Sequence, residues 1–108
     1  MAVATVTLQS AAAATGNGTA INFDTPGYMT PATVRLQVQG TFVGTVTYEG
    51  SVDGTNYAAV VATDASATST GEEILQFDVR GLALFRARVS AYTSGAINVT
   101  ARVVSEFD

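Results

Sequence analysis

A hairpin signature stands in the middle of the chain, in the stretch Val46-Thr47-Tyr48-Glu49-Gly50-Ser51-Val52-Asp53-Gly54-Thr55-Asn56-Tyr57. Its first half alternates apolar and polar residues, which is the pattern of a half-buried strand. Asp53-Gly54 follows with polar flanks, and glycine takes the positive φ that a tight β-turn demands. We therefore predict an antiparallel hairpin whose second strand opens at Tyr57. The stretch indicates architecture and carries no catalytic motif.

Length and composition favour a small β-domain. A chain of 108 residues is the size of one domain with one modest core, so we predict a single domain over residues 1–108. Hydrophobic residues make up 47% of the chain and the net charge is only −4, which argues against disorder. Thr, Ser, Ala, Val and Gly fill the sequence, and this composition is typical of strands and turns.

Several chemistries are excluded by missing residue types. The chain has no cysteine and no histidine, and its five basic residues are all arginines. Disulfides, thiolate or imidazole metal sites and Schiff-base chemistry are therefore ruled out. The acidic balance argues against nucleic acid as a partner. The first residues lack a positive residue before an apolar run, and no apolar segment is long enough to span a bilayer, so we expect neither export nor a membrane partner.

Alternation with a period of two continues outside the hairpin and predicts which side chains face the core. Turn signals recur about every 8–12 residues, and no segment shows helical periodicity. We predict an all-β fold, a single antiparallel β-sandwich of the jelly-roll or immunoglobulin-like type with about eight strands. The predicted inward sets are Val34, Leu36 and Val38; Leu75, Phe77 and Val79; Phe85, Ala87, Val89 and Ala91; and Ile97, Val99, Ala101 and Val103.

The last two strands are predicted to form a hairpin through the three-residue loop 93–95. This loop would pair Val89 with Val99 and Phe85 with Val103, so that both apolar sets lie on one face. It would also place Gly95 where a left-handed residue is needed. Strands are further predicted over residues 3–9 and 57–63, with loops over 10–18 and 64–71.

Three arginines are the first candidate binding residues. In the predicted register Arg86 and Arg102 lie directly opposite each other, with Arg88 two positions along. Like charges in such places are destabilising unless an acid intervenes. One interpretation is pairing with an acid of a neighbouring strand, either Asp78, Glu49 or Glu106. The other is a docking patch for an acidic or carbonyl-rich partner surface.

Aromatic residues at loops and strand ends are the second set of candidates. Tyr28, Tyr57 and Tyr92 are either ordinary half-buried contacts or anchors for a protein interface or a sugar. Met29 beside Tyr28, and the N-terminal segment 1–18, are further candidate contact regions. Strand interiors without lysine leave the sheet edges lightly guarded, which favours an oligomer.

Three other motifs have simpler explanations. Asp53-Gly54 lacks the ligand spacing of a calcium loop and predicts an Asx-type turn instead. The glycine-rich stretch 16–19 leads into a strand, so no helix follows it to hold a phosphate. Glu72 and Glu73 are adjacent in a strand and point to opposite faces, which does not suit a catalytic pair. We predict no catalytic residue, no metal and no cofactor.

Residues 34–46 (VRLQVQGTFVGTV), 49–57 (EGSVDGTNY) and 81–95 (GLALFRARVSAYTSG) resemble small β-sandwich virion proteins of tailed bacteriophages. The resemblance extends over roughly residues 33–104 and covers capsid decoration (cement) proteins and tail modules. Many related modules carry tryptophan where Tyr57 stands, so an aromatic ligand site is not carried over.

The resemblance implies a non-enzymatic virion protein that is assembled in the bacterial cytoplasm. The first expectation is a decoration protein that binds the major capsid protein at the outer surface of the head and stabilises it. It would form a homo-oligomer, with a trimer favoured. The alternative is a carbohydrate-binding or structural module of the tail or baseplate, which would contact a tail protein.

Overall fold

The computed structural model describes residues 3–24 and 31–105, and the regular structure within them consists of β-strands. Three of these strands, β2, β5 and β6, have only 2 residues each. The described strands are β1 Val3–Ala12, β2 Ile21–Asn22, β3 Pro31–Gln39, β4 Phe42–Ser51, β5 Ala58–Ala59, β6 Thr68–Ser69, β7 Glu73–Asp78, β8 Leu84–Gly95 and β9 Ile97–Ser105.

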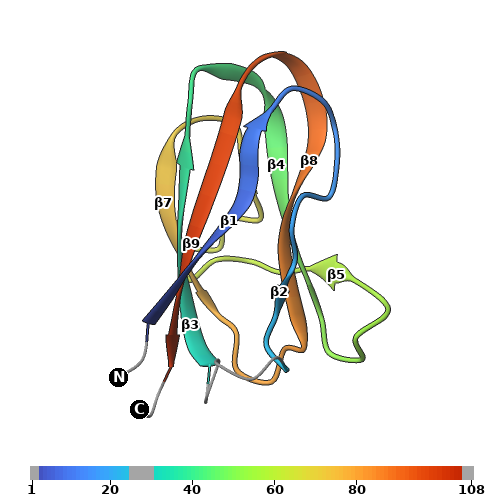
Figure 1. Ribbon diagram of the computed structural model, residues 1–108, viewed down its shortest axis with the longest axis vertical. Helices are drawn as coiled ribbons and strands as arrows, with labels where there is room; N and C mark the ends of the chain where they lie inside the picture. The colour runs from blue at the N-terminus through green and yellow to red at the C-terminus, as the bar shows by residue number, and fades with distance from the viewer. Residues whose placement is uncertain (1–2, 25–30, 106–108) are drawn as a thin grey trace.

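These strands form two sheets that face each other as two layers (Figure 1). Sheet A is 4-stranded, in the order β1-β9-β3-β7. Sheet B is 5-stranded, in the order β2-β8-β4-β5, with β6 also paired to β4. Every strand pair in both sheets is antiparallel. The predicted all-β antiparallel sandwich is confirmed.

The core lies between the two sheets and is built from the residues that alternate inward. Phe77 of sheet A lies between Tyr48 and Phe85 of sheet B, with ring centroids 4.9 and 5.0 Å apart. The tilted rings fill the centre of the sandwich, and such aromatic pairs add to the stabilisation from buried area. The predicted inward sets are fully buried except for Ala91; they are Val34, Leu36, Val38, Leu75, Phe77, Val79, Phe85, Ala87, Val89, Ile97, Val99, Ala101 and Val103.

A single folded ribbon runs through both sheets. Strand β3 pairs with β9 in sheet A, and β4, which follows β3, pairs with β8 in sheet B. The two corners of this ribbon lie together, at Gly40 (φ 118°) and Gly95 (φ 92°). A Cβ on Gly40 would overlap the Ala96 carbonyl oxygen, and a Cβ on Gly95 would overlap the Thr41 carbonyl oxygen. Glycine is therefore required at both corners, where the backbones pass in close contact.

The predicted hairpin between the last two strands is wrong. Strand β8 belongs to sheet B and β9 to sheet A, so Val89 pairs with Val46 and not with Val99. Phe85 likewise pairs with Gly50 rather than with Val103. The positive φ predicted for Gly95 is confirmed, but it serves the corner between sheets and not a hairpin turn. Both apolar sets still point into one core, because they approach it from opposite sheets.

A bulge in β8 changes which side chains point inward near its end. The register shifts between the pairs Thr45–Ala91 and Val46–Val89, which leaves Ser90 as the extra residue. Ala91, predicted to be inward, is therefore exposed, and Tyr92 packs against the core instead. The Ser90 hydroxyl is satisfied, since it contacts Thr47 Oγ1 at 2.7 Å and donates to the Thr45 carbonyl at 3.3 Å.

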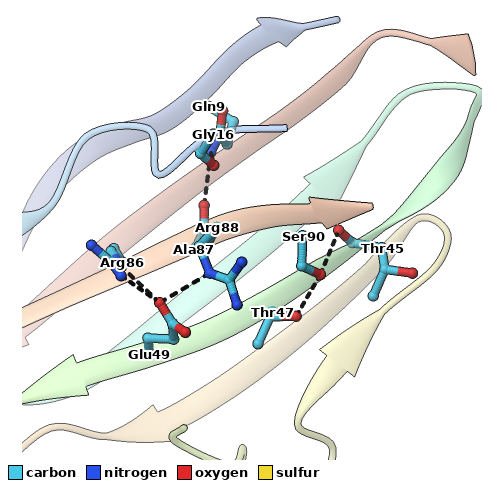
Figure 2. A network of polar contacts seen from close by, with 9 residues as sticks. All are labelled: Gln9, Gly16, Thr45, Thr47, Glu49, Arg86, Ala87, Arg88 and Ser90. Carbon is cyan, nitrogen blue, oxygen red and sulfur yellow. Dashed lines mark hydrogen bonds and ion pairs between the residues drawn. The ribbon is translucent and has the colours of Figure 1, made fainter. Parts of the chain in front are cut away.

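The N-terminal segment passes from one sheet to the other. Strand β1 pairs with β9 along sheet A, and the following chain then reaches sheet B, where Gly16 forms a bridge with Val89 of β8. Buried Gln9 ties this crossing together, because its Nε2 donates to the Ala87 carbonyl at 2.8 Å and to the Gly16 carbonyl at 3.3 Å (Figure 2). The strand predicted over residues 3–9 is confirmed and extends to Ala12.

The predicted hairpin after β4 is confirmed, although its second strand is short. Strand β5 pairs with β4 through Glu49–Ala59 and Gly50–Ala58, so only two residues of the predicted strand 57–63 are in the sheet. Gly54 has the expected positive φ of 81°. The predicted loop 64–71 contains β6, which pairs with β4 at Val46 and Thr47.

Candidate functional site

The outer face of sheet B carries a compact cluster of charged residues around Glu49 of β4. Arg86 and Arg88 project from β8 on the same face, because β8 alternates and its intervening residue Ala87 points into the core. Arg86 Nε donates to Glu49 Oε1 at 2.8 Å, and Arg86 Nη2 and Arg88 Nε lie 2.8 and 3.2 Å from the same oxygen (Figure 2). One carboxylate oxygen thus holds two guanidinium groups.

Tyr57 completes the cluster from the hairpin that follows β4. The Arg86 guanidinium carbon lies 3.7 Å from the centroid of the Tyr57 ring, which is a cation–π contact. The short β4–β5 pairing places Tyr57 beside Glu49 and Arg86, because Ala58 and Ala59 anchor the returning chain to β4. Arg86 is therefore held on two sides, by an aromatic face and by a carboxylate.

The electrostatics of the cluster favour an ionised Glu49. Partial burial by itself would raise the pKa of this carboxyl group, but the hydrogen bonds from Arg86 and Arg88 outweigh that effect and lower it. The side chains of Arg86 and Glu49 are 19% and 15% exposed, whereas Arg88 is 36% exposed. Arg88 is thus the member of the cluster most accessible to a partner.

The hairpin loop before Tyr57 is organised by Asp53. Asp53 Oδ1 accepts from the backbone N–H groups of Thr55 and Asn56 at 2.8 Å each, and Oδ2 accepts from Asn56 Nδ2 at 2.8 Å. These hydrogen bonds from Asn56 and Thr55 hold the pKa of Asp53 well below its usual range. The predicted Asx-type turn is confirmed.

Beside this loop lies a hollow of about 420 Å³ on the surface. Its wall is mostly apolar and includes Gly50, Val52, Val60 and Leu82. A Cβ at Gly50 would press on Val60 and Leu82, so the glycine lets these two side chains cover β4. The sequence pattern gave no indication of this hollow, because Leu82 joins residues 50–60 only through the fold.

The predicted neighbourhood of Arg86 and Arg102 is wrong. Arg102 lies on the outer face of sheet A, where its cross-strand neighbours are Thr5 of β1 and Arg35 of β3. Arg86 lies on sheet B, and the two arginines are separated by the core. Of the three acids proposed as partners, Glu49 is confirmed for Arg86 and Arg88. Sequence reasoning missed Arg35, although its place on the polar face of β3 was visible in the alternation.

The predicted tyrosine sites do not come together. Tyr92 is half-buried near the end of β8 and donates from its hydroxyl to the Gly95 carbonyl at 2.6 Å. Tyr57 adjoins Arg86, six residues back along β8, so the two rings are about 20 Å apart along the strand. Tyr28 and Met29 lie outside the described residues.

No group of three or more acidic residues suited to a metal ion occurs within residues 3–24 and 31–105. In the same part of the chain, no helix has the length and apolar character needed to cross a membrane.

Comparisons with known proteins identify the fold and the family. Residues 2–103 match the model of the XepA protein family. Among solved structures, the SPBc2 prophage-derived protein YomS is similar with a TM-score of 0.83 and 18% identity, over 96% of this chain and 94% of that protein. The PBSX exported protein XepA is similar with a TM-score of 0.84 and 20% identity, over 96% of this chain. No curated protein sequence matches the chain.

The match to XepA covers nearly all of this chain but only 38% of the length of the XepA structure. At 18% and 20% identity, the two likenesses show a shared fold. The expected resemblance to phage proteins is supported at the level of the family. A position in the head or in the tail stays a prediction.

Proposed function

The chain belongs to the XepA family, and on that premise we propose that it is a non-enzymatic phage protein that acts by binding other proteins. Its first proposed place is the outer surface of the capsid, as a decoration protein bound to the major capsid protein. YomS is a prophage-derived protein that matches nearly the whole of this chain, which supports a phage role.

The observation that carries this proposal is the arginine–tyrosine cluster on sheet B. Arginine and tyrosine are the residue types enriched where protein interfaces gain most of their binding energy. Here Arg86 is fixed between Tyr57 and Glu49, and Arg88 stands beside it with its side chain 36% exposed. A partner that binds this face meets groups that are already ordered, so little rotamer entropy is lost on binding.

Many copies bound at equivalent sites on a capsid would compensate for a small binding interface in each copy. About 800 Å² per partner is enough for a specific contact. Joining copies into an oligomer, with a trimer as the first proposal, would add avidity without new contacts. The lack of lysine in the edge strands β1 and β7 supports such self-association, because lysine is a common guard of free edges.

The proposal is tested by counting copies in purified virions with quantitative mass spectrometry. A decoration protein is expected at a number in proportion to the capsid protein, and recombinant protein is expected to bind capsids that lack it. Recovery of only a few copies per particle would place the protein in the tail instead. Absence from virions, together with no capsid binding, would overturn the proposal.

A second candidate is supported by one structural relative, XepA. XepA is described as an exported protein of PBSX, and its structure contains a region with this fold. On this proposal the module acts outside the cell that made it, on an envelope component, and the protein is recovered from the medium free of particles. Fractionation of an induced culture separates the two candidates.

The carbohydrate-binding alternative has less support. Tyr57 has one ring face against Arg86, and Tyr92 is about 20 Å away, so they do not form one stacking platform. A glycan array tests it directly, since a protein-binding decoration module should give no signal there.

A further inference from the structure

A second pair of arginines lies on the outer face of sheet A. Register places Thr5 of β1, Arg102 of β9, Arg35 of β3 and Gln76 of β7 side by side in one row across the four strands. Arg35 and Arg102 are directly opposite each other, and both side chains are exposed. Cβ atoms of such cross-strand neighbours are about 5 Å apart.

Among the described residues, this pair has no acid between its members. Within residues 3–24 and 31–105, no carboxylate lies within ion-pair distance of either guanidinium group, and Arg35 Nη2 donates to the neutral Gln76 Oε1 at 2.7 Å. Asp78, one row away on β7, uses its Oδ1 to accept from the backbone N–H of Arg80 at 3.1 Å. Two like charges directly opposite each other destabilise a sheet, so the fold itself gains nothing from this arrangement.

The surface around the pair is hollowed, and most of its exposed wall is apolar. A depression of about 170 Å³ is lined by both arginines together with Thr5, Thr100, Gln37 and Ile74. Guanidinium groups present forked N–H donors that match the two oxygens of a carboxylate, and threonine hydroxyls and a glutamine amide add further donors. The two guanidinium groups are thus suited to a small planar anion approached from solvent.

Sheet B shows what such a pair binds. There the cross-strand acid Glu49 places one oxygen between Arg86 and Arg88 at 2.8–3.2 Å. We propose that Arg35 and Arg102 bind a carboxylate side chain of an acidic segment on a partner protein, which takes the place that Glu49 has on sheet B. This inference rests on the proposed function and deepens it, because it assigns a docking face and the chemistry of the partner.

Charge selects this occupant over a second copy of the chain. A second copy packed face to face through the same patch would bring four arginines together, which is repulsive. A protein carboxylate satisfies both arginines without that conflict, and its short-range ion pairs have to outweigh the net charge of −4 on this chain.

The test is a titration of the full chain with an end-blocked hexaglutamate peptide at low salt, followed by NMR of the arginine Nε–H groups. The signals of Arg35 and Arg102 are expected to shift and saturate, while those of Arg86 and Arg88, already bonded to Glu49, stay in place. Arg102→Gln and Arg35→Gln are each expected to weaken binding about tenfold. The matched control Arg80→Gln, an exposed arginine that belongs to neither pair, is expected to leave the affinity unchanged.

Several outcomes would overturn the inference. Equal shifts at all five arginines, or equal affinity of the peptide for Arg102→Gln and the parent protein, would indicate nonspecific attraction. Saturation of the pair by inorganic phosphate as well as by peptide would indicate a general anion site. A change of oligomeric state in Arg102→Gln, seen by sedimentation, would make a second copy the occupant.

The test also separates this inference from the proposed function. If the parent protein binds capsids and the double variant Arg35→Gln/Arg102→Gln binds equally well, the docking face is wrong while the decoration role stands. If the parent protein is absent from virions and yet binds hexaglutamate through Arg35 and Arg102, the role is wrong and the carboxylate site stands. Thermal unfolding of each variant shows that a loss of binding does not reflect a loss of fold.

Discussion

The two outer faces of the sandwich each carry two arginines, and the two pairs differ in the groups that they contact. On sheet B, Arg86 and Arg88 share Glu49, and Arg86 also lies on Tyr57. On sheet A, Arg35 and Arg102 stand opposite each other with only Gln76 as a bonded neighbour among the described side chains. The first pair is ordered by bonds within its own sheet. The second pair has no carboxylate partner among the described residues, so the two faces differ in how far their arginines are already neutralised.

Both outer faces rest on one shared core. Phe77→Ala tests this, and it is expected to lower the free energy of unfolding more than any other change proposed below. Phe77 is fully buried between Tyr48 and Phe85 of the other sheet. Removing its ring leaves a cavity at the junction, and we expect a loss of about 4 kcal/mol in the free energy of unfolding. When urea unfolding is followed by fluorescence and by circular dichroism, the variant should unfold in one transition that both signals share, at a lower urea concentration than the parent. Separate transitions for the two sheets would contradict a common core.

A pH scan distinguishes the two sides of strand β4. Tyr48 points into the core, where burial raises its pKa from 10.0 to about 12; nearby Glu73 adds to the rise, and the hydrogen bond with Ser69 opposes it. Because the folded pKa is raised, the associated stability is complete below pH 10 and is lost as the pH rises toward 12. We expect a loss of about 3 kcal/mol over that window.

The control for the alkaline prediction is Tyr48→Phe, which has no group to ionise at that position. Its unfolding free energy at neutral pH should be lower than that of the parent, because Ser69 loses its partner. Between pH 10 and 12 it should fall less steeply than the parent. If the unfolding free energies of parent and variant fell equally between pH 10 and 12, Tyr48 would not be responsible for the alkaline loss of stability.

Glu49→Gln is expected to have the next largest effect, on the outer side of the same strand. The change removes the charge that holds Arg86 and Arg88 together, and we expect a loss of about 2 kcal/mol, moderated by the partial exposure of the cluster. Because the pKa of Glu49 is lowered in the folded protein, this contribution is present above pH 4.5, the ordinary value, and is lost as the pH falls further. The unfolding free energies of parent and variant should therefore become equal at acidic pH.

The smallest expected effect is on sheet A, and its sign distinguishes the two arginine pairs. Arg102→Gln removes one of two opposed like charges, so the free energy of unfolding should stay the same or rise by about 0.5 kcal/mol. The gain should shrink as salt is added, because the repulsion is screened. A clear destabilisation at low salt would mean that the sheet A pair supports the fold, as the sheet B pair does.

Side-chain alternation made the inward faces of the strands predictable from the sequence, but not their neighbours. The inner residues of β3, β7 and β9 were identified correctly, because burial on one face imposes a period of two. The pairing of β8 with β9 was wrong, since an apolar stripe meets the core equally well from either sheet. Gly95 carried the relevant signal, yet its positive φ fits a hairpin turn and a corner between sheets alike.

The candidate sites were predictable only where they depend on local sequence. The Asp53 turn followed from the Asp-Gly step, and Glu49 was among the acids proposed for Arg86 and Arg88. The Arg35–Arg102 row was not predictable, because it depends on β9 lying between β1 and β3, strands distant in the sequence. The β8 bulge, which exchanges Ala91 for Tyr92 at the core, has no marker in the sequence.

The continuous ladder through Gly40 and Gly95 has a consequence for how the two layers vary together. Since β3–β4 and β8–β9 remain paired across the corner, a residue inserted within one strand has to be absorbed as a bulge, as at Ser90, or it shifts the hydrogen-bonding partners beyond it. Length changes in the 52–57 loop leave this pairing intact. Natural variation among relatives is therefore expected to gather in that loop, with the length from residue 31 to residue 51 held constant.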